Sequence, residues 1–168
     1  MLKKVTYGII AVLVIMQFIR PSRNEAAGPF EKDIAKQFPM NKEVETALQK
    51  SCYDCHSNQT QYPWYSMIQP LGWWLQHHVD EGKEHLNFHE FLSYSPKKQD
   101  HKLEEIEEAV RDGWMPLDSY SWIHKDAVLN ENEKAAIMTW VKESRQKVQP
   151  FDKTQGGKEE KTHEDHQE

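Results

Sequence analysis

The stretch Cys52-Tyr53-Asp54-Cys55-His56 reads C-x-x-C-H and contains both cysteines of the 168-residue chain. Thiols three residues apart lie about one helical turn apart, so both can add to the two vinyl groups on one edge of a haem. The imidazole of His56 then follows directly and offers a neutral nitrogen to the iron. The motif therefore predicts one covalent haem c, held by Cys52 and Cys55 as thioethers, with His56 as the proximal iron ligand.

Three other interpretations of the two cysteines are weaker. A thioredoxin-like dithiol needs a βαβ context, and no Val/Ile-rich strand precedes Cys52. A zinc site needs a second pair of ligands, for which the only substitutes are His77-His78 and the pair His85 and His89. A structural disulfide across two intervening residues is strained. Haem attachment is the favoured interpretation.

Composition limits the class of protein. The chain has room for one domain plus appendages. Charged residues make up 29%, the mean hydropathy is -0.86 and the net charge is -6, which disfavours a nucleic-acid partner. Six Trp, six Tyr and six Phe suit a small helical domain around a large flat cofactor, although ordinary core packing would use them equally well.

The amino terminus has the pattern of an export segment. Lys3 and Lys4 precede an apolar run over residues 5–19, and Arg20 follows it. The run is long for a signal-peptide core and short for a span of about 20 residues. We expect an uncleaved inner-membrane anchor over residues 1–23, with a cleaved signal peptide and a soluble periplasmic protein as the alternative. In both cases the domain lies on the periplasmic side, where haem c is attached.

The remaining sequence predicts an all-α, cytochrome c-like domain over residues 41–149. A linker over 24–40 precedes it, and a disordered polar tail over 150–168 follows it. Capping residues and apolar periodicity predict five helices. They run from Lys42 to about Lys50, from Pro70 to near Gly82, from Asn87 through Leu92, from Pro96 to Arg111, and onward from Asn130.

The sixth position of the iron is assigned to Met115. It stands before Pro116 in a loop just ahead of the last helices, where a thioether can reach the open face of the iron. A methionine filling a core gap is the alternative use of this residue. His78, on the expected apolar face of its helix, is the alternative distal ligand. We further expect the carbonyl of Pro63 or Pro70 to accept a hydrogen bond from the ring of His56.

Residues from about 40 to 147 resemble the haem-binding domain family of small bacterial monohaem proteins, and their layout is more distantly similar to class I cytochromes c. The resemblance lies in Ser51 to Asn58, Tyr62 to Tyr65, Trp73-Trp74, His78-Val79, Glu81 to Lys83, Leu86 to Phe88, Met115 to Leu117, and Tyr120. It implies covalent haem binding and single-electron transfer with a protein redox partner, so an electron carrier is expected rather than an enzyme. The alternative is a haem-based sensor of small ligands, or a haem enzyme, with a displaceable distal ligand.

Overall fold

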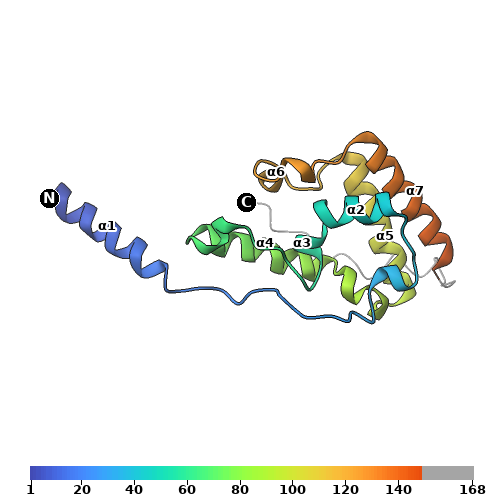
Figure 1. Ribbon diagram of the computed structural model, residues 1–168, viewed down its shortest axis with the longest axis horizontal. Helices are drawn as coiled ribbons and strands as arrows, with labels where there is room; N and C mark the ends of the chain where they lie inside the picture. Colours follow the sequence, from blue (N-terminus) through green and yellow to red (C-terminus); the bar gives the residue numbers. More distant parts are fainter. Residues whose placement is uncertain (149–168) are drawn as a thin grey trace, which may run out of the picture.

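The computed structural model describes residues 1–148, and these form helices joined by turns (Figure 1). The α-helices are α1 (Leu2–Met16), α2 (Lys42–Ser51), α3 (Tyr53–His56), α4 (Leu71–His85), α5 (Pro96–Asp112), α6 (Asp118–Ser121) and α7 (Glu131–Lys147). Short 3-10 helices lie between them: η1 (Ile34–Lys36), η2 (Trp64–Met67), η3 (Phe88–Ser93) and η4 (Lys125–Ala127). The only strand pairing within this range is an isolated bridge between Glu25 and Gln59. The all-α class is confirmed, and the predicted tail over 150–168 lies outside the described residues.

Three of the domain's longer helices, α2, α5 and α7, begin at a capping side chain. The side chain of Asn41 accepts a hydrogen bond from the amide of Val44, and Ser95 caps α5 in the same way. At α7, Asn130 accepts from the amide of Glu133 while the Glu133 carboxylate accepts from the amide of Asn130, a complete capping box. The predicted starts of α2, α5 and α7 are confirmed. They could be predicted because a cap depends only on residues that are neighbours in the sequence.

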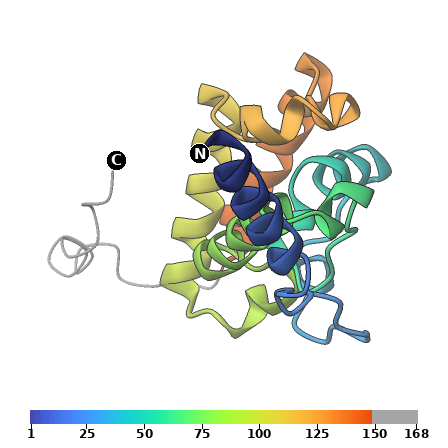
Figure 2. The ribbon, with the colours of Figure 1, turned by 90° about the vertical axis from the view of Figure 1, so that its left-hand side faces the viewer.

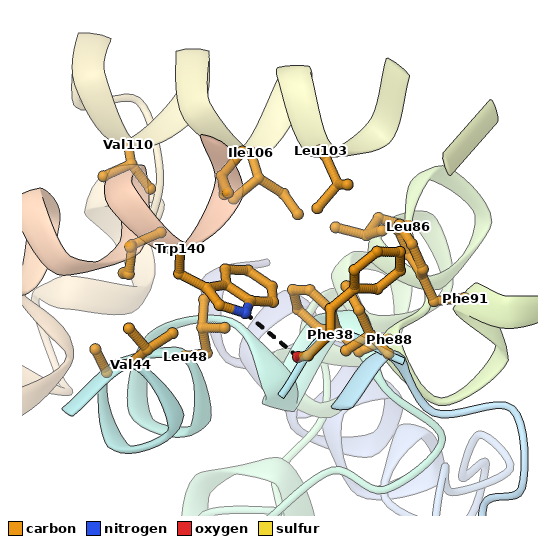
Figure 3. Packing of buried hydrophobic residues seen from close by; sticks show 14 of the residues in the cluster. Phe38, Val44, Leu48, Leu86, Phe88, Phe91, Leu103, Ile106, Val110 and Trp140 are labelled. Atoms are coloured by element: carbon orange, nitrogen blue, oxygen red, sulfur yellow. Dashed lines mark hydrogen bonds between the residues drawn. The ribbon is translucent and has the colours of Figure 1, made fainter. Parts of the chain in front are cut away.

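The core lies where α2, α5 and α7 pack together. Figure 3 shows Trp140 of α7 pointing toward Phe38, and its indole N–H donates to the Phe38 carbonyl at 3.3 Å. Leu103 of α5 is fully buried above them. Outside this core, Arg145 of α7 forms an ion pair with Asp100 of α5 at 3.0 Å, which fixes the two helices side by side.

The segment over residues 24–40, which we expected to be a linker, packs against the domain. Ile34 and Phe38 are completely buried and belong to the core cluster. The Asn24 amide donates to the carbonyl of Ser57 at 2.8 Å, and Lys83 donates to the Asn24 side-chain oxygen at 2.6 Å. These hydrogen bonds join residues 33 and 59 positions apart, so local composition could not indicate them.

At the other end of the molecule, α1 extends away from the helical body (Figure 1), and the view from that side places it in front of the body (Figure 2). Within residues 1–148, no helix is both long enough and apolar enough to cross a membrane. Fifteen residues rising ~1.5 Å each reach roughly 22 Å, less than the ~30 Å of a bilayer's hydrocarbon core. The predicted membrane helix over residues 1–23 is therefore not supported.

Candidate functional site

The C-x-x-C-H motif forms a single turn that continues from α2. The amide of Cys52 still donates to the Leu48 carbonyl of α2, and the amide of His56 donates to the Cys52 carbonyl at 2.9 Å. The helix α3 and its N-cap residue Cys52 thus place the side chains of Cys52, Cys55 and His56 along the wall of one cavity. This is the helical arrangement that the spacing of the motif predicts.

The packing of α4 against this turn depends on a glycine. A Cβ atom on Gly82 would lie 2.6 Å from the carbonyl oxygen of Cys55 and 3.0 Å from its Cβ. Side chains at this position would therefore push α4 off the motif. The prediction that the helix ends near Gly82 is wrong, since α4 continues to His85. This glycine allows the backbones of α4 and the motif to approach closely. From the sequence alone, a glycine with this role looks the same as one that ends a helix.

His56 is oriented by a carbonyl on the chain that follows α4. Its Nδ1 lies 3.1 Å from the carbonyl oxygen of Leu86. Because a carbonyl only accepts, Nδ1 carries the proton and Nε2 retains a lone pair. Burial lowers the pKa of His56 below its ordinary 6.5, although the hydrogen bond to Leu86 opposes this, so the ring is neutral at neutral pH. The expectation that Pro63 or Pro70 supplies this carbonyl is wrong.

The two thiols are held in their protonated form. Burial raises the pKa of Cys52 to about 12 and that of Cys55 to about 11, with the neighbouring Cys55 and Asp54 charges adding to the effect. A reactive dithiol needs a lowered pKa, so this environment argues against the thioredoxin-like alternative. Among residues 1–148, no three His, Cys, Asp or Glu side chains gather as they would around a metal ion.

A cavity of about 500 Å³ brings all the predicted site residues together. Met115 and His78, the two candidates for the distal position, both line it beside the C-x-x-C-H turn. Its volume is in the range of sites for drug-sized ligands and cofactors. Most of the remaining wall is apolar and comes from Leu86, Phe88, Ile106, Ala109, Val110, Trp114, Pro116 and Leu117.

The expected face of α4 is divided between this cavity and solvent. His78 lines the cavity, whereas Leu71 and Trp74 of the same face are 47% and 42% exposed. The ring of His78 packs edge-on against that of Trp74, with 4.6 Å between the ring centroids. The Nδ1 of His78 lies 3.7 Å from a carboxylate oxygen of Glu81. His78 is thus held on its helix by two neighbours. Periodicity grouped these residues on one face but could not tell which of them the rest of the domain would cover.

Sequence reasoning did not identify the pair that connects the motif to the Met115 segment. The Tyr120 hydroxyl, on α6, donates to one oxygen of Asp54 at 2.7 Å, and the Gln61 amide donates to the other at 2.9 Å. Burial, followed by the hydrogen bond to Asp54, raises the pKa of Tyr120 and keeps it a donor. An acidic residue inside the motif and a tyrosine five residues after Met115 were the only sequence signals of this contact.

Other polar groups at the cavity were also not assigned in advance. They are Ser51, Glu81 and Glu105. His85, which the sequence offered only as a substitute zinc ligand, lines the cavity as well. Two thiols and a neutral imidazole on one wall, apolar side chains around them, and further side chains able to bind iron elsewhere in the wall together fit a flat, mostly apolar, iron-containing cofactor.

Comparison with known proteins agrees with this geometry. The family model described as the haem-binding domain matches residues 11–143, which is most of the chain. No curated protein and no solved structure shows a significant match.

Proposed function

The chain belongs to the haem-binding domain family, and on that basis we propose that it binds one haem c covalently and carries single electrons. The observation that supports this most directly is the shared cavity. Both thiols of the C-x-x-C-H motif, its histidine and Met115 line the same space of about 500 Å³. When bound, the haem would supply an iron that changes oxidation state by one electron.

In this proposal Cys52 and Cys55 hold the cofactor through thioether bonds, and His56 is the proximal ligand. The Leu86 carbonyl keeps the ring of His56 in the tautomer whose Nε2 is free for the metal. The hydrogen bond from Tyr120 to Asp54 keeps the motif turn and the segment after Met115 in a fixed relation. Apolar residues of α5 exclude water from the side of the cavity that they line.

Met115 is proposed as the distal ligand, with His78 as the alternative. The contacts of His78 with Trp74 and Glu81 favour this choice, since they give the imidazole other partners on its own helix. A thioether ligand raises the reduction potential relative to a second imidazole and leaves no open position for a substrate. We place the domain on the periplasmic side, supported by Lys3 and Lys4 before the apolar run and by the site of haem c attachment.

The visible spectrum of the oxidised full-length chain, expressed with haem-maturation enzymes, tests the proposal. We expect a six-coordinate low-spin spectrum with the weak red band of sulfur-ligated ferric haem. Met115→Ala should remove this band and leave the haem covalently attached. The control is Met67→Ala, whose side chain is 46% exposed and outside the cavity, and which should keep the wild-type spectrum.

Each alternative has a distinct outcome. Loss of the low-spin spectrum in His78→Ala, with Met115→Ala unchanged, would reassign the distal ligand. A high-spin spectrum with rapid CO binding in the wild type would favour the sensor or enzyme class over electron transfer. Covalent attachment is checked separately by haem staining of denatured protein, which should be lost in the Cys52→Ala/Cys55→Ala double variant.

A further inference from the structure

The helix α1 has no buried residue, and after Lys3, Lys4 and Thr6 in its first turns its residues are uncharged and mostly apolar on every side. The large apolar side chains from Leu2 to Ile15 are between 46% and 81% exposed. A helix of this kind is stable when apolar surroundings enclose it completely, as in a large core or a lipid bilayer. A protein groove would cover only one of its sides. Lys3, Lys4 and Arg20, at the two ends of the apolar run, can reach anionic lipid headgroups.

The carboxyl-terminal end of α1 is fixed to the domain at one place, the turn between η2 and α4. The Gln17 side-chain amide donates to the Gln69 carbonyl at 3.1 Å, and the Gln69 amide donates back to the Gln17 side-chain oxygen at 2.9 Å. The indole N–H of Trp73 donates to the carbonyl of Ile19 at 2.8 Å. Three hydrogen bonds therefore determine which face of the domain lies beside the base of α1.

That face is an apolar surface, which we call the η2–α4 patch. It consists of Trp64, Met67, Ile68, Leu71 and Trp74, with exposed fractions of 77%, 46%, 44%, 47% and 42%. Tryptophan is enriched at the boundary between lipid and water, because its ring is apolar and its N–H is polar. Arg20, which ends the apolar run, lies against the patch, with a guanidinium nitrogen 3.5 Å from the Met67 sulfur.

We propose that the η2–α4 patch rests on the surface of a lipid bilayer in which α1 is immersed. The hydrogen bonds of Gln17 and Trp73 hold the base of α1 and the patch at the same level, so one lipid surface contacts both. The proposal concerns the face of the domain that meets lipid and does not require α1 to cross the bilayer. It is independent of the ligands assigned to the cavity.

The patch also sets the position of the cavity relative to the lipid surface. Trp74 belongs to the patch, and its ring contacts that of His78, which lines the cavity. Immersion of α1 would therefore hold the cavity about one helical turn from the lipid. The distance between the cavity and the lipid surface would then be fixed, whereas a flexible linker would let the domain move freely.

The test uses the full-length chain with vesicles of phosphatidylcholine containing a minority of phosphatidylglycerol. The double variant Ile68→Gln/Leu71→Gln should partition into the vesicles about tenfold less than the wild type, because two partly exposed apolar side chains no longer contact lipid. The matched control is Val128→Gln, a 54% exposed apolar residue on the link between η4 and α7, which should partition as the wild type does. All three proteins should melt at the same temperature, since the altered side chains are exposed.

Hydrogen exchange supplies the second measurement. With vesicles, amides of residues 64–74 should exchange roughly tenfold more slowly, while those of α7 stay unchanged. Equal partitioning of the double variant and the wild type would overturn the proposal. Protection of α1 without protection of residues 64–74 would also overturn it, since α1 alone would then contact lipid. A dimer detected by light scattering without lipid, with the same residues protected, would assign the patch to a second copy of the chain.

Discussion

The space between α2, α5 and α7 is filled by side chains, whereas the space between α3, α4 and the segment around Met115 is a cavity of about 500 Å³. The two regions share a wall, because Ile106 and Val110 of α5 belong to the core cluster and also line the cavity. The filled side is stabilised by its own apolar contacts. The hollow side has polar hydrogen bonds, such as that of Tyr120 with Asp54, and the exposed Trp114 at its edge. We therefore expect that the hollow side depends on the cofactor for its final order and that the filled side does not.

Removal of the cofactor should have the largest effect and should separate the two regions. In chain expressed without haem-maturation enzymes, we expect amides of residues 113–124 to exchange at least about tenfold faster than in the haem-bound protein, while those of α7 change little. Hydrogen exchange followed by mass spectrometry measures both. Equal acceleration in α7 would show that the core also depends on the cofactor and would remove the distinction.

Phe38→Ala should strongly destabilise the filled side. The side chain is completely buried, and its ring packs edge-on against Phe91 with 6.0 Å between centroids. Truncation leaves a cavity and should lower the free energy of unfolding by about 3–5 kcal/mol, as measured by denaturant titration. Phe18→Ala is the control, because that ring is 82% exposed, and it should leave the unfolding of the domain unchanged.

Gly82→Ala tests the close approach on the hollow side. The new methyl group would meet the Cys55 backbone, which cannot move without shifting the motif, so we expect a loss of about 1–3 kcal/mol in unfolding free energy. Gly8→Ala adds the same atom to α1, where nothing lies within 4 Å, and should not destabilise the domain. A stability gain in Gly82→Ala would mean that helix propensity outweighs this contact and that α4 can move away from the motif.

The smallest expected effect is a dependence of folding stability on pH through His89. This residue is buried, and its ring stacks on that of Phe30 with 3.6 Å between the ring centroids. Burial lowers the pKa of His89 below 6.5, while the nearby Asp33 charge opposes this. As pH falls below about 6.5, the unfolded chain binds a proton that the folded chain does not, so folding stability decreases. Above pH 7 this contribution is fully present.

Denaturant titrations between pH 7 and pH 5 measure this slope. His89→Gln should reduce it, while His77→Gln should not, because the side chain of His77 is 65% exposed. In the haem-free chain, part of the pH dependence of folding stability will remain in both variants. The reason is that burial also lowers the pKa of His56, which contributes a dependence of the same sign. An identical slope in wild type and His89→Gln would show that the burial of His89 does not contribute.

Much of the secondary structure could be predicted because its signals are local. Asn41, Ser95 and Asn130 cap the helices that they were expected to cap, and apolar periodicity gave the core face of α5. Gly82 was misread because a glycine near a helix end predicts a stop unless the neighbouring backbone is known. The burial of Ile34 and Phe38 was missed because it depends on residues about a hundred positions away, such as Trp140.

The sequence by itself determined the helical class, the turn that presents Cys52, Cys55 and His56, and the family to which these residues point. The helices and the turn follow from residues within one or two helical turns of one another. The family resemblance uses several short motifs between Ser51 and Tyr120, each of which can be read locally. Only the tertiary structure decided that Leu86 orients His56, that Tyr120 binds Asp54, and that Met115 and His78 face the same cavity. Those pairs of residues are between 30 and 66 positions apart in the sequence. Packing of the whole domain selects them from many partners that are equally plausible from the local sequence.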